Sequence, residues 1–186
     1  DRIEAVGGEL TALQSSGADA ARVVVLEKQM KELEEQHRRL IHQNEFDLLY
    51  AEAGKSGLNA FTSQDWTCYH VSLPANRLDL WALMESERLR DPVLREFYKE
   101  RDVVCEERRM RTETSPGGLL WERMVTTAYV RHPYGRPIIG WMPEIQGLTI
   151  AKARAFHRVH YAPCNAVGVL VGDIDIATTR EMLKRT

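Results

Sequence analysis

The sequence predicts an α+β fold in which helices pack on a mostly antiparallel sheet. Residues 66–73 alternate between two faces, which is typical of a strand in a hairpin. Residues 166–171 form a continuous apolar run, which predicts a strand buried on both faces. Segments with helical spacing lie on either side of both runs, and helices beside strands favour α+β layers. We therefore expect residues 66–73 and 166–171 to pair in one sheet.

Composition limits the possible functions before any motif is considered. The chain has 186 residues, 44% of them hydrophobic, which is enough for one globular domain with a core. The net charge is −2 with both signs interspersed, so the sequence predicts no nucleic-acid partner. No apolar run approaches the length of a membrane span. The 3 cysteines are isolated and indicate neither a disulfide framework nor a thiolate zinc site.

The N-terminal quarter contains one strong helical pattern. Residues 1–18, with Gly7-Gly8, are weakly patterned and are expected to form a loop. Residues 19–46 are expected to be helical, because apolar residues recur in a heptad-like seam that includes Leu26 and Met30. Two interpretations stay open for this charged helix. It either packs one stripe on its own domain or projects as an arm that contacts a partner.

The remaining elements follow in order along the chain. A short strand at 58–62, a turn at 63–65 and the strand at 66–73 predict a hairpin. Asp91-Pro92 has the form of a helix start, so a helix is expected from residue 92 to about residue 112. Further helices are expected at 77–89, 119–129 and 148–161, and a last one follows the run at 166–171.

Two carboxylates in the helix at 92–112 form a candidate site. Glu100 and Glu107 are seven residues apart, which is almost two turns, so both lie on one stripe roughly 10 Å apart along the axis. On pattern alone, such residues usually belong to a solvated face, and several arginines nearby could pair with them. The alternative is a zinc ligand, because a carboxylate on a rigid helix suits a metal. Two further ligands would have to come from elsewhere.

An ordered series of motifs carries a family resemblance. The segment Glu100-Arg101-Asp102-Val103-Val104, with Glu107, is followed by Arg131-His132-Pro133-Tyr134-Gly135, by Tyr161-Ala162-Pro163-Cys164-Asn165 and by Val171-Gly172-Asp173. In this order they resemble the pitrilysin/insulinase family of zinc metallopeptidases, the peptidases with an inverted zinc motif, over roughly residues 54–176. The resemblance implies a metallopeptidase half-domain of the LuxS/processing-peptidase-like type, incomplete at both ends, and Zn²⁺ as cofactor of the complete protein.

The resemblance also implies residue roles. Glu107 corresponds to the third zinc ligand, and Glu100 to the catalytic helper, an acid that lies beside the site and supports it. The strand Asn59-Ala60-Phe61-Thr62 corresponds to the strand that binds substrate by backbone hydrogen bonds. The other interpretation of this strand is an ordinary hairpin edge. Glu106 is adjacent to Glu107 but points about 100° away around the helix.

The inverted His-x-x-Glu-His motif of the family is absent from the chain. His42-Gln43-Asn44-Glu45-Phe46 has Phe46 where the second histidine should be, and we interpret it as coincidence. His157 and His160 could bind a metal from one helix face, but packing or capping roles are favoured. We therefore expect an internal fragment that begins after the motif. Residues 1–143, with a charged helical insertion at 19–52, would complete the N-terminal peptidase domain, and residues 144–186 would open the following C-terminal-type domain.

The expected function is part of a zinc metalloendopeptidase, and the chain alone should be inactive. Expected partners are a peptide or protein substrate and a second peptidase half or homologous subunit, with no membrane span. One alternative is a catalytically inactive family relative that serves as a structural or partner subunit. Another is an interaction module built on the charged helix at 19–46. Composition leaves the compartment undetermined, and the resemblance implies the periplasm or another exported compartment in a bacterium.

Overall fold

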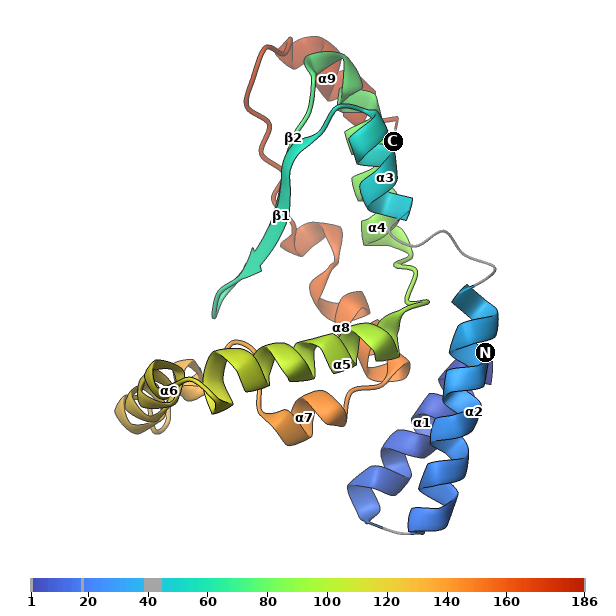
Figure 1. Ribbon diagram of the computed structural model, residues 1–186. Coiled ribbons are helices and arrows are strands. Elements are labelled where there is room, and N and C mark those ends of the chain that lie inside the picture. Colours follow the sequence, from blue (N-terminus) through green and yellow to red (C-terminus); the bar gives the residue numbers. More distant parts are fainter. Residues whose placement is uncertain (1, 18, 39–44, 186) are drawn as a thin grey trace. The chain divides into compact units, whose positions relative to one another are not determined.

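The computed structural model describes residues 2–17, 19–38 and 45–185. Figure 1 shows the order of helices and strands along the chain. The main elements are α1 (Arg2–Ser16), α2 (Ala20–Arg38), α3 (Glu45–Glu52), β1 (Ser56–Thr62), β2 (Thr67–Ser72), α4 (Leu78–Arg90), α5 (Phe97–Arg108), a π-helical turn η2 (Arg109–Glu113), α6 (Pro116–Ala128), α7 (Met142–Gln146), α8 (Ile150–His160) and α9 (Ile176–Leu183). Short 3-10 turns lie at Ala75–Arg77, Pro133–Gly135 and Pro163–Asn165. Helices beside an antiparallel hairpin confirm the α+β class.

The chain divides into two compact units. The first comprises Asp1–Ile41, Thr62–Trp66 and Leu94–Arg154, and the second comprises His42–Phe61, Thr67–Val93 and Ala155–Thr186. The division expected between residues 143 and 144 concerns the domains of the family and stays a prediction.

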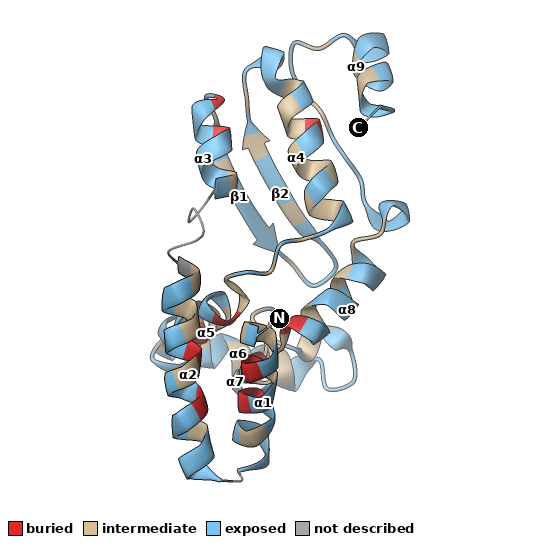
Figure 2. Ribbon diagram, turned by 90° about the vertical axis from the view of Figure 1, so that its right-hand side faces the viewer, coloured by how far each residue is buried: buried red, intermediate tan, exposed pale blue. Residues whose placement is uncertain are grey.

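The core of the first unit lies between α1, α2, α5 and the start of α8. Its buried members are Val6, Leu10, Leu26, Met30, Tyr98 and Ile150. Figure 2 shows buried positions on the facing sides of α1 and α2. Leu26 and Met30, from the seam expected in residues 19–46, thus pack inside their own unit. This agrees with the interpretation in which the helix packs one stripe on its own domain. The part of that seam beyond Arg38, with His42, Gln43 and Asn44, lies outside the described residues.

The loop expected at residues 1–18 is wrong, because Arg2–Ser16 is helical. Gly7 explains the difference. A Cβ at Gly7 would lie 2.3 Å from the ring of Tyr98, closer than any side chain allows. The glycine therefore permits a close approach between α1 and α5 and does not break the helix. A pair of glycines in the sequence does not distinguish these two uses.

The second unit is built on the β1–β2 hairpin, as the sequence predicted. The turn between the two strands, where Ser63 N donates to Trp66 O at 2.9 Å, is assigned to the first unit. The guanidinium of Arg88, on α4, lies 3.7 Å above the ring of Tyr69, on β2. Tyr50, on α3, is buried and donates to Glu85 at 3.0 Å. These contacts hold α3 and α4 on the hairpin.

The strand expected at Ala166–Val171 is wrong. The only sheet among the described residues has two strands, β1 and β2, and residues 166–171 belong to neither. Val167 and Val171 are 90% and 92% exposed, so the run is not buried on both faces. Apolar composition alone cannot form a strand, since the backbone also needs a neighbouring chain to pair with. Residues 66–73 and 166–171 therefore do not share a sheet here.

The helix expected from residue 92 begins five residues later, at Phe97. Asp91 ends the preceding helix instead: its backbone N–H makes the last helical bond, to Glu87 O at 2.9 Å, and its own backbone angles, φ −148° and ψ 85°, are not helical. The far end is also different: α5 stops at Arg108 and continues into the π-helical turn η2. Among the described helices, none combines the length and apolar character that crossing a membrane requires.

The two glycines of α1 provide a matched test of this packing. Gly7→Ala should lower the free energy of unfolding by about 1–3 kcal/mol, because the new methyl group would clash with the Tyr98 ring. Gly8→Ala is the control, since a Cβ there meets nothing within 4 Å, and it should stabilise α1 by roughly 0.5–1 kcal/mol. Urea unfolding of the 186-residue chain gives both values. Equal effects of the two substitutions would contradict the described packing.

Candidate metal centre

The face that α5 buries is defined by four residues at helical spacing. Tyr98, Cys105 and Arg108 are buried, and Arg101 lies on the same side. Burial is the main cause that raises the pKa of the Cys105 thiol, so this thiol stays protonated and is a poor metal ligand at neutral pH. The face is thus occupied by packing and by two arginines, and any ligand on α5 must come from its other side.

Arg101 joins α5 to two other parts of the first unit. Its Nη1 donates to Thr11 Oγ1 on α1 at 3.1 Å and to the carbonyl oxygens of Gln146 and Leu148 at 3.1 and 3.3 Å. Its guanidinium also lies 5.1 Å from the ring centroid of Tyr98. These contacts fix the first half of α5 against α1 and against the connection between α7 and α8.

Arg108 holds the last turn of α5. Its Nη1 donates to Glu122 Oε2 at 3.0 Å and to Gly140 O at 2.8 Å, and its Nη2 donates to Glu122 Oε1 at 3.2 Å. The guanidinium lies 5.5 Å from the ring centroid of Trp141. Arg108 is only 4% exposed. A two-pronged bond between a buried arginine and a carboxylate has a fixed geometry, so it restricts the orientation of this turn.

The π-helical turn brings α6 into reach of Arg108. In this turn Thr114 N donates to Arg109 O, five residues back, at 2.9 Å. A Cβ at Gly118 would lie 2.1 Å from Arg111 O, so only glycine permits α6 to pack this tightly on the turn. Ser115 caps α6 by accepting from Gly118 N. One turn further along α6, Glu122 meets Arg108.

Glu100 and Glu107 lie on the outward side of α5. Glu100 is exposed, and the side chain of Glu107 is 34% exposed and pairs with Arg111 at 2.9 Å. Val103, between them along the stripe, is 52% exposed. Glu106 points elsewhere and pairs with Arg109. The expected stripe is therefore present and is turned away from the buried face of the helix.

Of these residues, Glu107 has a position that suits a single metal ligand. Glu107 offers a carboxylate on a helix whose opposite face is anchored, which is the kind of rigid support that a ligand needs. Across residues 2–17, 19–38 and 45–185, no group of three or more histidines, cysteines, aspartates or glutamates could hold a metal ion. The described residues thus form no complete metal centre, and the ligand role expected for Glu107 stays a prediction.

The two helical histidines of α8 are engaged in packing. His157 stacks on Tyr161 with centroids 4.9 Å apart and planes at 14°, and His160 lies against Phe156 at 4.3 Å. Tyr161 in turn makes a 2.6 Å hydroxyl contact with Tyr69. Burial, followed by this bond, raises the pKa of Tyr69. The packing interpretation of both histidines is supported.

The expected substrate-binding residues belong to β1, at the edge of the two-stranded sheet. Asn59, Ala60, Phe61 and Thr62 are all exposed. Asn59 Oδ1 accepts from Ala60 N at 2.8 Å, and the Phe61 ring lies 6.2 Å from that of His70 on β2. An exposed strand at a sheet edge can take up an extended peptide by backbone hydrogen bonds.

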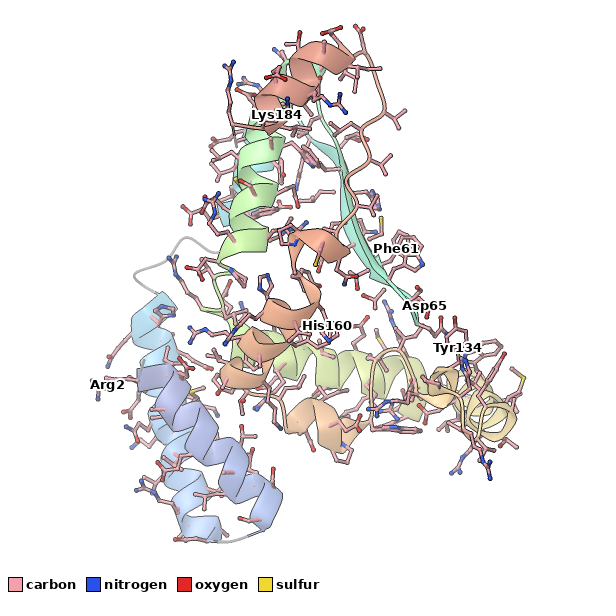
Figure 3. The ribbon with its side chains drawn as sticks, turned by 180° about the vertical axis from the view of Figure 1, so that it is seen from behind. Arg2, Phe61, Asp65, Tyr134, His160 and Lys184 are labelled. Atoms are coloured by element: carbon pink, nitrogen blue, oxygen red, sulfur yellow. The ribbon has the colours of Figure 1, made fainter. Side chains whose placement is uncertain are left out.

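Two contacts were not expected from the sequence. The Arg108–Glu122 pair joins residues fourteen apart in the sequence. The one signal for it was the charge of Arg108 on the apolar side of α5. Tyr134, in the His-Pro-Tyr-Gly segment, donates to Asp65 in the turn of the hairpin. Figure 3 shows these two side chains directed toward each other. The segment is therefore a structural contact of the first unit.

Comparison with known proteins gives relatives of one kind. The chain is 39% identical to zinc protease PqqE of Helicobacter pylori over 143 residues, which is 76% of this chain and 32% of the relative. It is 32% identical to an uncharacterized zinc protease of Mycobacterium leprae over 67% of this chain and 29% of that relative. It is also 31% identical to the probable zinc protease PqqL of Escherichia coli, over 68% of this chain and 14% of the relative. No family model matches.

A solved structure agrees with these sequences. The crystal structure of a protease from Helicobacter pylori superposes with a TM-score of 0.73 and 38% identity, covering 78% of this chain and 35% of that one. The chain thus spans about a third of the length of the first two relatives and of this structure. Zinc, which the names of the relatives carry, is the cofactor implied for a complete protein of this kind. The chain belongs to the pitrilysin/insulinase-type family of zinc peptidases.

Proposed function

We propose that the complete protein is a zinc metalloendopeptidase and that this chain supplies its third zinc ligand, Glu107. The observation that carries the proposal is the orientation of α5. Buried arginines occupy one side of the helix, and Glu107 extends from the other with a half-exposed carboxylate. The relatives named as zinc proteases support the reaction class.

Each residue has a part in the proposed reaction. Glu107 would donate one carboxylate oxygen to the metal, and Glu100, on the same stripe, would support the site as a neighbouring acid. Residues Asn59 to Thr62 would hold the substrate as an added strand through backbone hydrogen bonds, which read peptide shape with little side-chain selectivity. When bound, zinc polarises a water molecule for attack on the scissile carbonyl.

Partners and location follow from the same proposal. The substrate would be a peptide or protein, and a second peptidase half or a homologous subunit would supply the rest of the site. The relatives compared are bacterial proteins, and in a bacterium we place the proposed activity in the periplasm or another exported compartment. A catalytically inactive subunit is the competing function, and loss of the ligand carboxylate would be without consequence in it.

Three glutamates on one helix test the ligand assignment in the complete protein. Glu107→Gln keeps the shape and removes the charge, so it should abolish zinc retention and peptide hydrolysis, a larger loss than the roughly 10–100-fold typical of supporting residues. Glu100→Gln should lower activity while more metal stays bound. Glu106→Gln is the control and should do little, because that carboxylate already pairs with Arg109 on another side of the helix.

Metal content after dialysis and the rate of peptide cleavage give the ranking of the three variants. Loss of zinc in Glu106→Gln with retention in Glu107→Gln would shift the assignment by one residue. Retention of zinc and activity in all three would mean that α5 presents only a charged surface.

The chain by itself should bind zinc weakly or not at all. One carboxylate cannot replace the two missing imidazole ligands of a zinc site. Calorimetry on the purified 186-residue chain checks this expectation. Tight stoichiometric binding that depends on His42 or His157 would instead show that a histidine we assign to packing or to coincidence is a ligand.

A further inference from the structure

Two consecutive residues of α5 have opposite surroundings. Glu107 is half-exposed, whereas Arg108 is 4% exposed and makes three hydrogen bonds, two to Glu122 and one to Gly140 O. Neighbouring side chains on a helix are separated by 100°. The direction of Arg108 therefore determines the direction of Glu107. The contacts that fix the Arg108 side chain also orient the Glu107 carboxylate.

The backbone changes its hydrogen-bond pattern directly after Arg108. The α-helical hydrogen-bond pattern ends there and is replaced by the wider π-helical turn. Such turns are frequent at functional sites. At this change of pattern, Arg108 connects the end of α5 both to α6 through Glu122 and to the loop at Gly140 and Trp141.

We propose that the Arg108–Glu122 pair is a positioning device that aims the Glu107 carboxylate at the metal. This inference rests on the proposed function, because it takes Glu107 as the ligand. Gly118 is part of the same device, since its close approach to the backbone of η2 places α6 where Glu122 can reach Arg108. Neither arginine nor glutamate of the pair touches the metal or the substrate in this scheme.

Arg101 provides the matched control. It lies seven residues before Arg108, on the same buried side of α5, and it also joins the helix to other elements by hydrogen bonds. Its contacts reach α1 and the α7–α8 connection and not α6. Substitution of either arginine by lysine keeps the charge and removes the planar, multiply bonded group. A purely structural role predicts similar consequences for both.

The experiment compares Arg108→Lys, Glu122→Gln and Arg101→Lys in the complete protein. The zinc dissociation constant is measured by competition with a chelator, and the unfolding midpoint is measured on the same samples. Arg108→Lys and Glu122→Gln should weaken zinc binding by about 10–100-fold, the range found for residues that support a metal ligand. Arg101→Lys should lower the unfolding midpoint and leave zinc affinity within about twofold, since it does not hold the turn of Glu107.

Cobalt substitution reports on ligand geometry separately from stability. The absorption spectrum of the cobalt-loaded protein should change in Arg108→Lys and Glu122→Gln and stay unaltered in Arg101→Lys. Glu122→Gln keeps the size of the side chain, so it tests the positioning role even if Arg108→Lys fails to fold. Unchanged zinc affinity and cobalt spectrum in Glu122→Gln, or equal losses in the Arg101 and Arg108 variants, would overturn the positioning role.

The Glu107→Gln variant distinguishes failure of the positioning role from failure of the proposed ligand role of Glu107. If Glu107→Gln loses zinc while Glu122→Gln keeps it, the ligand assignment stands and the positioning role fails. If Glu107→Gln retains zinc, the proposed function fails, and the inference fails with it.

Discussion

Two buried arginines on one helix are the constraint on which the first unit depends. Removing a guanidinium from water costs several kcal/mol unless hydrogen bonds replace the lost hydration. The terminal Nη groups of Arg101 and Arg108 find such partners on four different segments: α1, α6, the loop before α7 and the connection to α8. Because those partners are far apart in sequence, α5 is held in one rotational setting. The outward direction of its acidic stripe follows from that setting.

The sequence was informative wherever local spacing decides the outcome. The hairpin at β1 and β2 and the helix seam of α2 could be predicted because alternation and heptad spacing are local properties. The common stripe of Glu100 and Glu107 could be predicted for the same reason.

The errors arose where a distant contact decides the outcome. Gly7 looked like a helix breaker because the ring of Tyr98, 91 residues away, does not show in its neighbourhood. Residues 166–171 looked like a buried strand, but a strand requires a neighbour that composition does not reveal. Asp91 could have begun or ended a helix, and its extended backbone ends one. For the site, the sequence predicted Glu107 as a ligand, which stays a prediction, but not Glu122, which bonds to the neighbouring Arg108.

The π-helical turn has a consequence for how this region can tolerate insertions and deletions. Its extra backbone residue sets the phase between α5 and α6, and Gly118 then fits against it without room for a methyl group. Deleting one residue within Arg109–Glu113 would restore ordinary α-helical geometry locally, yet every later residue would be displaced by one position. Glu122 would swing by about 100° and lose Arg108. We therefore expect this turn to tolerate substitutions better than changes in the number of its residues.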